Sequence, residues 1–231
     1  MEEIEFICLA NSRKHGGKCV AGIRTDGKGW IRLVSFWGDG VLQPAQTVLP
    51  GAGVAQALDH VRAAFRFARR APHQPENWVL ADAPWQLVSR PAKDHAVPLL
   101  RAHIAKGPAL FGNTEDRIAY AALQIAPADA SLALAFVNFI EWQIVEANGK
   151  RRARVRFVVG TQVYDLGLTD PFWEARIAKL PPGRYAKETA GLKRDDRLLL
   201  TISLGEPFRD GCCYKLVAGI IPVPQSWLAL F

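Results

Sequence analysis

Basic and aromatic side chains of the kind that contact nucleic acid gather in the first forty residues. They are Arg13, Lys14, Lys18, Arg24, Trp30, Arg32 and Trp37. Guanidinium and ammonium groups attract phosphates, and an exposed indole stacks on an unpaired base. The sequence therefore predicts a surface that binds a polyanion. The alternative is that either tryptophan belongs to the core, because large aromatic residues are highly buried on average, and that the charges only solvate a loop.

A second basic set recurs with the period of a β-strand. Arg152, Arg154 and Arg156 alternate with apolar residues, so their side chains share one face and recur about every 6.6 Å. This spacing suits contact with successive phosphates. The alternative, weighed equally, is a charged outer face that keeps the sheet soluble. Lys215, in a later apolar run, completes the set of candidate nucleic-acid contacts.

Short strands with glycine-rich turns must position these residues. Residues 6–10, 19–23 and 30–37 form apolar runs separated by turn residues, as in a curled meander. Asn148-Gly149 joins two further runs, and Asn-Gly is a strong signal for a two-residue hairpin turn. The second half then has the order strand, short helix, strand, strand, which indicates a small closed barrel with one helix at its end. We expect a mainly β protein with a few short helices.

Two short segments are expected to be helical, whereas residues 55–70, whose alanines favour a helix, alternate as a strand from about Asp59 onward. Residues 95–106 have a helical pattern that Gly107-Pro108 ends. Residues 172–179 form the second helix, in which Asp170 is the expected N-cap and Pro171 the first helical residue.

Residues suited to catalysis are sparse. The chain contains no P-loop, no Rossmann glycine motif, no HExxH and no GxSxG. The four cysteines lack metal-ligand spacing, so we expect neither a metal nor a cofactor. Glu206 is the acid with the most suggestive position, although a cross-strand ion pair with Lys215 is the simpler interpretation. A hydrolase or transferase would use Glu206 and Asp170 as its acids.

Composition indicates an ordinary globular protein with a basic surface. The chain has 231 residues, enough for one large all-β domain or two domains of about 100 to 120 residues each. Apolar residues make up 49% and charged residues 22%, which excludes a disordered chain. The net charge of +7 favours polyanionic partners. No signal peptide and no long apolar segment occurs, so we expect a cytoplasmic protein without membrane contact.

Motifs along nearly the whole chain resemble, in order, the dual OB-containing domain family of bacteria. The first three are Cys8-Leu9-Ala10-Asn11-Ser12-Arg13-Lys14, Gly17-Lys18-Cys19-Val20-Ala21-Gly22 and Trp30-Ile31-Arg32. The middle ones are Gln74-Pro75-Glu76-Asn77, Phe111-Gly112-Asn113 with Asp116-Arg117, and Tyr164 with Thr169-Asp170-Pro171. The last are Ser203-Leu204-Gly205-Glu206-Pro207 and Tyr214-Lys215-Leu216-Val217-Ala218. Leu33 departs from the pattern, in which a proline follows Trp-Ile-Arg.

The resemblance implies two OB-like barrels packed together and a nucleic-acid-binding role in a bacterial defence or conflict system. We expect the barrels to span residues 1–115 and 116–231. The leading hypothesis is a non-catalytic module that binds DNA or RNA, with single strands favoured, and that works with a partner effector protein. One alternative is a sensor of a small nucleotide or modified nucleoside held in a barrel pocket. The enzyme described above is the weaker alternative.

Overall fold

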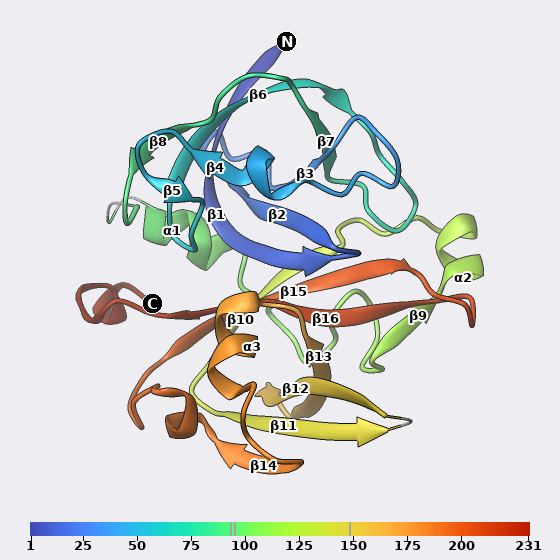
Figure 1. Ribbon diagram of the computed structural model, residues 1–231, viewed down its shortest axis with the longest axis vertical. Helices are drawn as coiled ribbons and strands as arrows, with labels where there is room; N and C mark the ends of the chain where they lie inside the picture. The colour runs from blue at the N-terminus through green and yellow to red at the C-terminus, as the bar shows by residue number, and fades with distance from the viewer. Residues whose placement is uncertain (93, 95, 148) are drawn as a thin grey trace.

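Two strand-rich halves stack one on the other in the computed structural model, which describes residues 1–231 except residues 93, 95 and 148 (Figure 1). Strands β1 to β8 form the upper half, drawn from blue to green, and strands β9 to β16 form the lower half, drawn from green to red. The protein is mainly β with a few short helices, and this confirms the predicted fold class.

The first half closes into a five-stranded barrel. Neighbouring strands follow the order β1 (Glu2–Lys14), β2 (Gly17–Arg24), β3 (Trp30–Val34), β7 (Asn77–Leu80) and β6 (His60–Ala68). β6 then pairs with β1 and completes the ring. β3 and β7 run parallel, whereas the other neighbours run antiparallel. Three further strands lie outside the ring: β4 (Val48–Leu49), β5 (Gly53–Val54) and β8 (Gln86–Ser89).

The length of β1 allows this closure. Its first half, from Glu2 to Ile7, pairs with β6, and its second half, from Phe6 to Lys14, pairs with β2. A register shift between Cys8 and Ala10 lies in the middle of the strand. Because such bulges bend and twist a strand, β1 can serve both sides of a small barrel.

The second half repeats this strand order. Its strands are β10 (Leu132–Val137), β11 (Ile140–Ala147), β12 (Lys150–Val159), β13 (Gln162–Leu168), β16 (Cys212–Pro222) and β15 (Leu198–Pro207). β13 and β16 are parallel, as β3 and β7 are. β10 pairs with β15 while β11 pairs with β12, so together they take the place that β1 has in the first barrel. The edge strands are β9 (Arg117–Ala119) and β14 (Gly183–Ala186).

The predicted hairpin joins β11 to β12. Ala147 pairs with Lys150, which leaves a two-residue connection, and Gly149 has a φ of 66°. Asn148, the other predicted turn residue, lies outside the described residues. The alternation in β12 also follows the prediction, because Val155 and Phe157 are buried while Arg152 is exposed.

Short helices cap the barrels and the junction between them. The α-helices are α1 (Ala96–Ala102), α2 (Tyr120–Ile125) and α3 (Pro171–Ile177), and the 3-10 helices are η1 (Pro44–Thr47), η2 (Lys187–Ala190) and η3 (Gln225–Leu230). The predicted cap of α3 is confirmed, because the Asp170 carboxylate accepts a 3.0 Å hydrogen bond from the backbone N–H of Phe172. α1 is shorter than the predicted helix over residues 95–106, whose first residue is outside the described part of the chain.

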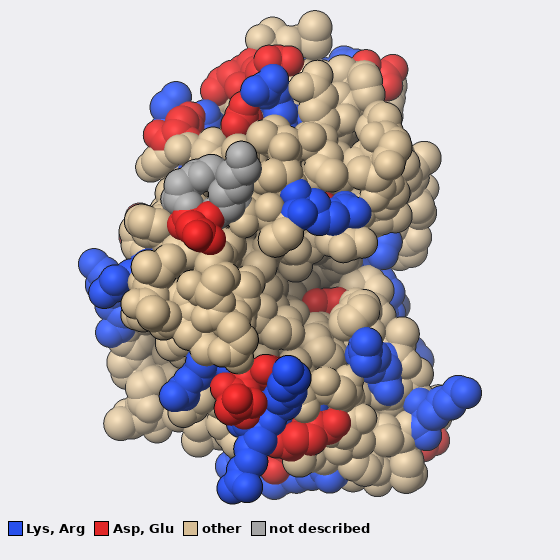
Figure 2. All heavy atoms as spheres, turned by 90° about the vertical axis from the view of Figure 1, so that its left-hand side faces the viewer, with Lys and Arg blue, Asp and Glu red and all other residues tan. Residues whose placement is uncertain are grey.

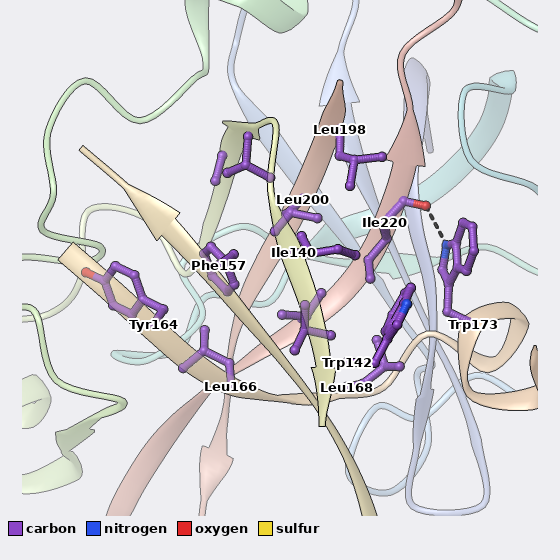
Figure 3. Packing of buried hydrophobic residues seen from close by; sticks show 14 of the residues in the cluster. Ile140, Trp142, Phe157, Tyr164, Leu166, Leu168, Trp173, Leu198, Leu200 and Ile220 are labelled. Atoms are coloured by element: carbon purple, nitrogen blue, oxygen red, sulfur yellow. Dashed lines mark hydrogen bonds between the residues drawn. The ribbon is translucent and has the colours of Figure 1, made fainter. Parts of the chain in front are cut away.

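Four aromatic residues pack among aliphatic ones in the core of the second barrel (Figure 3). Trp142 and Trp173 stack with their ring centroids 5.5 Å apart, and the Trp173 indole donates a 2.7 Å hydrogen bond to the Ile220 carbonyl. Phe157 stacks on Tyr164 at 5.5 Å. The contacts of Trp173 attach α3 to the barrel wall, since Trp173 belongs to this helix.

The barrels pack directly against each other through β1 and β16. Ile7 and Leu9 share an apolar cluster with Leu199 of the second barrel, and the Thr201 hydroxyl donates a 2.8 Å hydrogen bond to the Leu9 carbonyl. A Cβ atom on Gly219 would lie 2.4 Å from the same carbonyl, so glycine is required for this approach. The proposed boundary between residues 115 and 116 remains a prediction.

Candidate nucleic-acid interface

Three exposed aromatic side chains form a group at one end of the first barrel. Trp37 is 77% exposed, Phe67 47% and Phe36 42%. The Phe36 ring lies between the other two, with its centroid 4.9 Å from that of Trp37 and 6.4 Å from that of Phe67. Exposed aromatic side chains that gather in this way offer a surface on which bases stack. The alternative that Trp37 is a core residue is therefore wrong.

Two arginines flank these rings. The Arg66 guanidinium lies 5.3 Å from the Phe36 ring centroid, and Arg69 donates a 3.3 Å hydrogen bond to the Phe36 carbonyl. No carboxylate in the described part of the chain forms a salt bridge with either arginine. We call Phe36, Trp37, Arg66, Phe67 and Arg69 the Trp37 cluster. It combines aromatic faces with available positive charge.

Local backbone geometry explains how the Trp37 cluster is presented. Trp37 lies in the tight loop after β3, where the Ser35 backbone N–H donates to the Gly40 carbonyl at 2.9 Å. Gly40 has a φ of 79°, and a Cβ atom there would lie 2.4 Å from the Arg69 guanidinium. In β6, a register shift between Phe65 and Phe67 interrupts the inward alternation, so Phe67 is exposed although Phe65 is fully buried.

The predicted basic loop contains two residues that already have ionic partners. Arg13 makes a bidentate contact with Glu174 at 2.6 and 3.2 Å. The Lys14 ammonium contacts Glu206 at 2.8 Å, and its side chain is 13% exposed. Lys18 is half-buried and lines a pocket between the barrels. The structure therefore directs these three side chains toward the barrel junction and does not bring them into one open patch.

Arg24 and Arg32 correct the prediction of an exposed basic surface. Arg24 is 4% exposed, is bonded to Asp26 at 2.6 and 3.0 Å, and lies 5.3 Å from the Trp78 ring centroid. Arg32 is 2% exposed and donates hydrogen bonds to Ser131 and Ser203 of the second barrel. Both guanidinium groups are used inside the fold, so neither is placed to bind a phosphate.

Trp30 and Lys215 are two further corrections. Trp30 is half-buried and packs against the apolar clusters at the junction, so the core interpretation applies to Trp30. Lys215 is 1% exposed and donates to the carbonyl and side-chain oxygens of Asn113 at 2.9 and 2.7 Å. Burial lowers the pKa of Lys215 to about 8. Its role in this structure is to hold the segment around Asn113 against β16.

The three arginines of β12 project from one face, as predicted, but they differ in their surroundings. Arg154 is bonded to Asp165 at 2.7 Å, and Arg156 lies 4.0 Å from Glu141. Arg152 is exposed and has no salt-bridge partner among the residues that the structure describes. Since exposed ion pairs neutralise much of the charge, Arg152 is the member of this set that is available to an anion.

Glu206 lies at the barrel junction with two partners from the first barrel. Its carboxylate contacts His73 at 2.6 Å and Lys14 at 2.8 Å. The predicted pair with Lys215 is therefore wrong. Burial raises the pKa of Glu206, but the hydrogen bonds from His73 and Lys14 outweigh it and bring the pKa to about 2. The ionised Glu206 carboxylate, with its hydrogen bonds to His73 and Lys14, therefore links the two barrels.

A pocket of about 670 Å³ lies between the barrels. Figure 2, in which the left-hand side of Figure 1 faces the viewer, shows the surface hollowed between the two halves. Lys18 and Asn11 line it from the first barrel, and Phe172 and Arg176 line it from α3. The Phe172 ring is 57% exposed and lies 4.7 Å from the Arg176 guanidinium. We call this cavity the Phe172 pocket.

Asp170 also lines the Phe172 pocket, but it has structural partners. Burial raises its pKa, and it accepts hydrogen bonds from the backbone N–H groups of Phe172 and Ile220. No group of three or more metal-binding side chains is found among the residues described. Nor does any described helix have the length and apolar character needed to cross a membrane.

Comparison with known proteins identifies the family. The family model described as "Dual OB-containing domain" matches residues 4–220. No curated protein matches the chain. One similar solved structure is described as a murine DNA-binding protein bound with ds DNA; it is 7% identical, the match covers 96% of this chain and 98% of that chain, and the TM-score is 0.32. Because the family match includes both barrels, the chain belongs to the dual OB-containing domain family.

Proposed function

We propose that this protein binds nucleic acid through the Trp37 cluster and prefers single strands. The observation that carries the proposal is Trp37 itself, which is 77% exposed beside two other exposed aromatic rings. Leaving large apolar rings in water is unfavourable unless a partner covers them. Unpaired bases stack on such rings, and arginines beside them bind the phosphates.

We also propose that the role is non-catalytic. This proposal is supported by the structural hydrogen bonds and ion pairs of Glu206 and Asp170, the two acids that an enzyme would use. Glu206 is held by His73 and Lys14, and Asp170 caps α3. The family resemblance further supports a role in a bacterial defence or conflict system together with a partner effector protein. The cytoplasm is the proposed location.

The direct test is a titration of a fluorescein-labelled oligothymidylate of about 30 nucleotides, a length suited to two barrels that each cover about 4 to 16 nucleotides. Fluorescence anisotropy is measured at about 50 and 200 mM salt, because polynucleotide binding weakens steeply with salt. Trp37→Ala should weaken binding by about 1 to 3 kcal/mol and leave the melting temperature unchanged. Duplex DNA and RNA of the same length test the preference for single strands.

A matched control is Phe139→Ala, which removes a ring that is 48% exposed on the second barrel. It should bind the oligonucleotide as the wild type does. If Trp37→Ala also binds as the wild type does, or if the wild type binds no oligonucleotide, the proposed function is wrong.

The Phe172 pocket favours a second candidate function, the binding of a small nucleotide. Its volume of about 670 Å³ is within the range of ligand sites, and it offers an exposed ring together with Lys18 and Arg176. Calorimetric titration with adenosine monophosphate would test this function. Binding that weakens in both Phe172→Ala and Lys18→Gln, with a smaller salt response than the oligonucleotide has, would favour the nucleotide sensor over the polynucleotide binder.

A further inference from the structure

A second hollow at the barrel junction has four positive side chains among its ten described lining residues. It has a volume of about 500 Å³. Arg13 lines it from the first barrel, and Lys150, Arg151 and Arg152 line it from β12. Glu174 is the one carboxylate among its described lining residues. We call this cavity the Arg13 pocket.

Hydrogen bonds from its backbone and from its side chain hold Arg13 against the second barrel. The backbone N–H of Arg13 donates a 2.8 Å hydrogen bond to the Thr169 carbonyl, at the end of β13. The side chain then reaches Glu174 on α3 with two hydrogen bonds, of 2.6 and 3.2 Å. This fork is also the geometry with which a guanidinium binds two oxygens of a phosphate.

The Arg13–Glu174 pair is open to solvent on the arginine side. The Arg13 side chain is 61% exposed, whereas that of Glu174 is 22% exposed. An ion pair that is this accessible is weak, because water competes for both charges. An anion that arrives from solvent can therefore displace Glu174 at small cost.

The other basic residues differ in their availability. Arg151 already donates to the carbonyls of Ile177 and Leu180, so it is fixed as part of the pocket wall. Lys150 and Arg152 are exposed, and no salt bridge from either of them to a described carboxylate is present. With Arg13, they provide positive charge from both barrels around one hollow.

We propose that the Arg13 pocket binds a phosphate group of the nucleic-acid backbone, and that Glu174 competes with this phosphate for Arg13. The inference rests on the proposed nucleic-acid binding and adds to it a site that spans both barrels. When the phosphate binds, Arg13 exchanges a carboxylate for a phosphate, and Arg152 and Lys150 contact the same group or its neighbour. Glu174 thereby sets the affinity of the site.

The test is the substitution Glu174→Gln, measured with the labelled oligothymidylate at two salt concentrations. Removing the competitor should tighten binding about fivefold at low salt, the factor expected for one exposed ion pair. The slope of log affinity against log salt should stay close to that of the wild type, because the same phosphate is bound in both proteins. In the double variant Arg13→Gln/Glu174→Gln the gain should disappear.

Glu188→Gln is the matched control, since it removes the same charge from an exposed position on the same barrel, outside the Arg13 pocket. It should leave the affinity at low salt close to that of the wild type. If Glu174→Gln behaves as Glu188→Gln does while Trp37→Ala still weakens binding, the phosphate site is wrong and the proposed function remains. If Glu174→Gln tightens binding equally in the Arg13→Gln background, competition for Arg13 is wrong.

Discussion

Arg32 of the first barrel donates a 2.7 Å hydrogen bond from its guanidinium to the hydroxyl of Ser131 at the start of the second barrel. The same hydroxyl donates to the Glu76 carboxylate at 3.0 Å. A serine hydroxyl can accept and donate at once, so it connects a buried cation with a buried anion. This relay explains how both charges are accommodated at the junction, where Arg32 is 2% and Glu76 is 8% exposed.

Arg32→Met should destabilise the protein without acting on a binding surface. The substitution leaves Glu76 without its cationic counterpart in a buried site, and breaking buried ionic pairs costs about 3 to 5 kcal/mol. Urea denaturation followed by tryptophan fluorescence would measure the change in the free energy of unfolding. A variant that retained its stability but bound the oligonucleotide more weakly would instead mean that Arg32 touches the nucleic acid.

Local signals in the sequence predict much of the fold. The β11–β12 hairpin follows from alternation and a turn that contains Gly149, and the start of α3 follows from Asp170 and the proline after it. These features depend on residues that are close in the chain. For the same reason the exposed position of Arg152 and the buried position of Val155 are predictable from strand alternation alone.

The candidate site is harder to predict, because its geometry depends on distant residues. Arg32 is buried by contacts with Ser131, 99 positions away, and Lys215 by contacts with Asn113, 102 positions away. Neither partner has a sequence signal that points to it. Phe67 has the parity of the inward residues of its strand, and only the register shift after Phe65 exposes it. Sequence reasoning therefore missed Phe67, and it missed Arg66 and Arg69, which become significant only beside the aromatic rings.

Gly149→Val should destabilise the hairpin. Gly149 has a φ of 66°, a conformation that a β-branched residue adopts only with strain, although the space around it is open. We expect a decrease of about 1 kcal/mol or more in the free energy of unfolding. Gly27→Val provides a comparison, since Gly27 also has an open environment and a φ of 77°. An unchanged melting temperature in Gly149→Val would contradict the assigned turn strain.

Glu206→Gln should lower stability in a way that depends on pH. The pKa of Glu206 is lowered from its ordinary value of 4.5 to about 2 in the folded protein, so its ionised form stabilises the fold above pH 4.5. That contribution is lost as the pH falls toward 2. At pH 7 the variant should be less stable by about 1 to 3 kcal/mol, because the neutral glutamine amide replaces the charged acceptor of the hydrogen bonds from Lys14 and His73.

Denaturation of wild type and Glu206→Gln at a series of pH values from 7 to about 3 measures this difference. The two stability curves should converge on the acidic side. A constant difference across the series would mean that the pKa of Glu206 is the same in the folded and unfolded chains.

The arginines of β12 should contribute unequally to nucleic-acid binding. If they bind phosphates as a set, replacing all three with glutamine flattens the salt dependence by about 0.7 to 0.9 for each phosphate that is no longer bound. Arg154 is bonded to Asp165 and Arg156 lies near Glu141, whereas Arg152 lines the Arg13 pocket. We therefore expect Arg152→Gln alone to account for most of the change, and Arg154→Gln to leave the slope close to that of the wild type.

Equal effects of the two single variants would show that the ion pair with Asp165 opens when nucleic acid binds. If the triple variant bound as the wild type does at both salt concentrations, the arginines of β12 would be only a solvated outer face of the sheet.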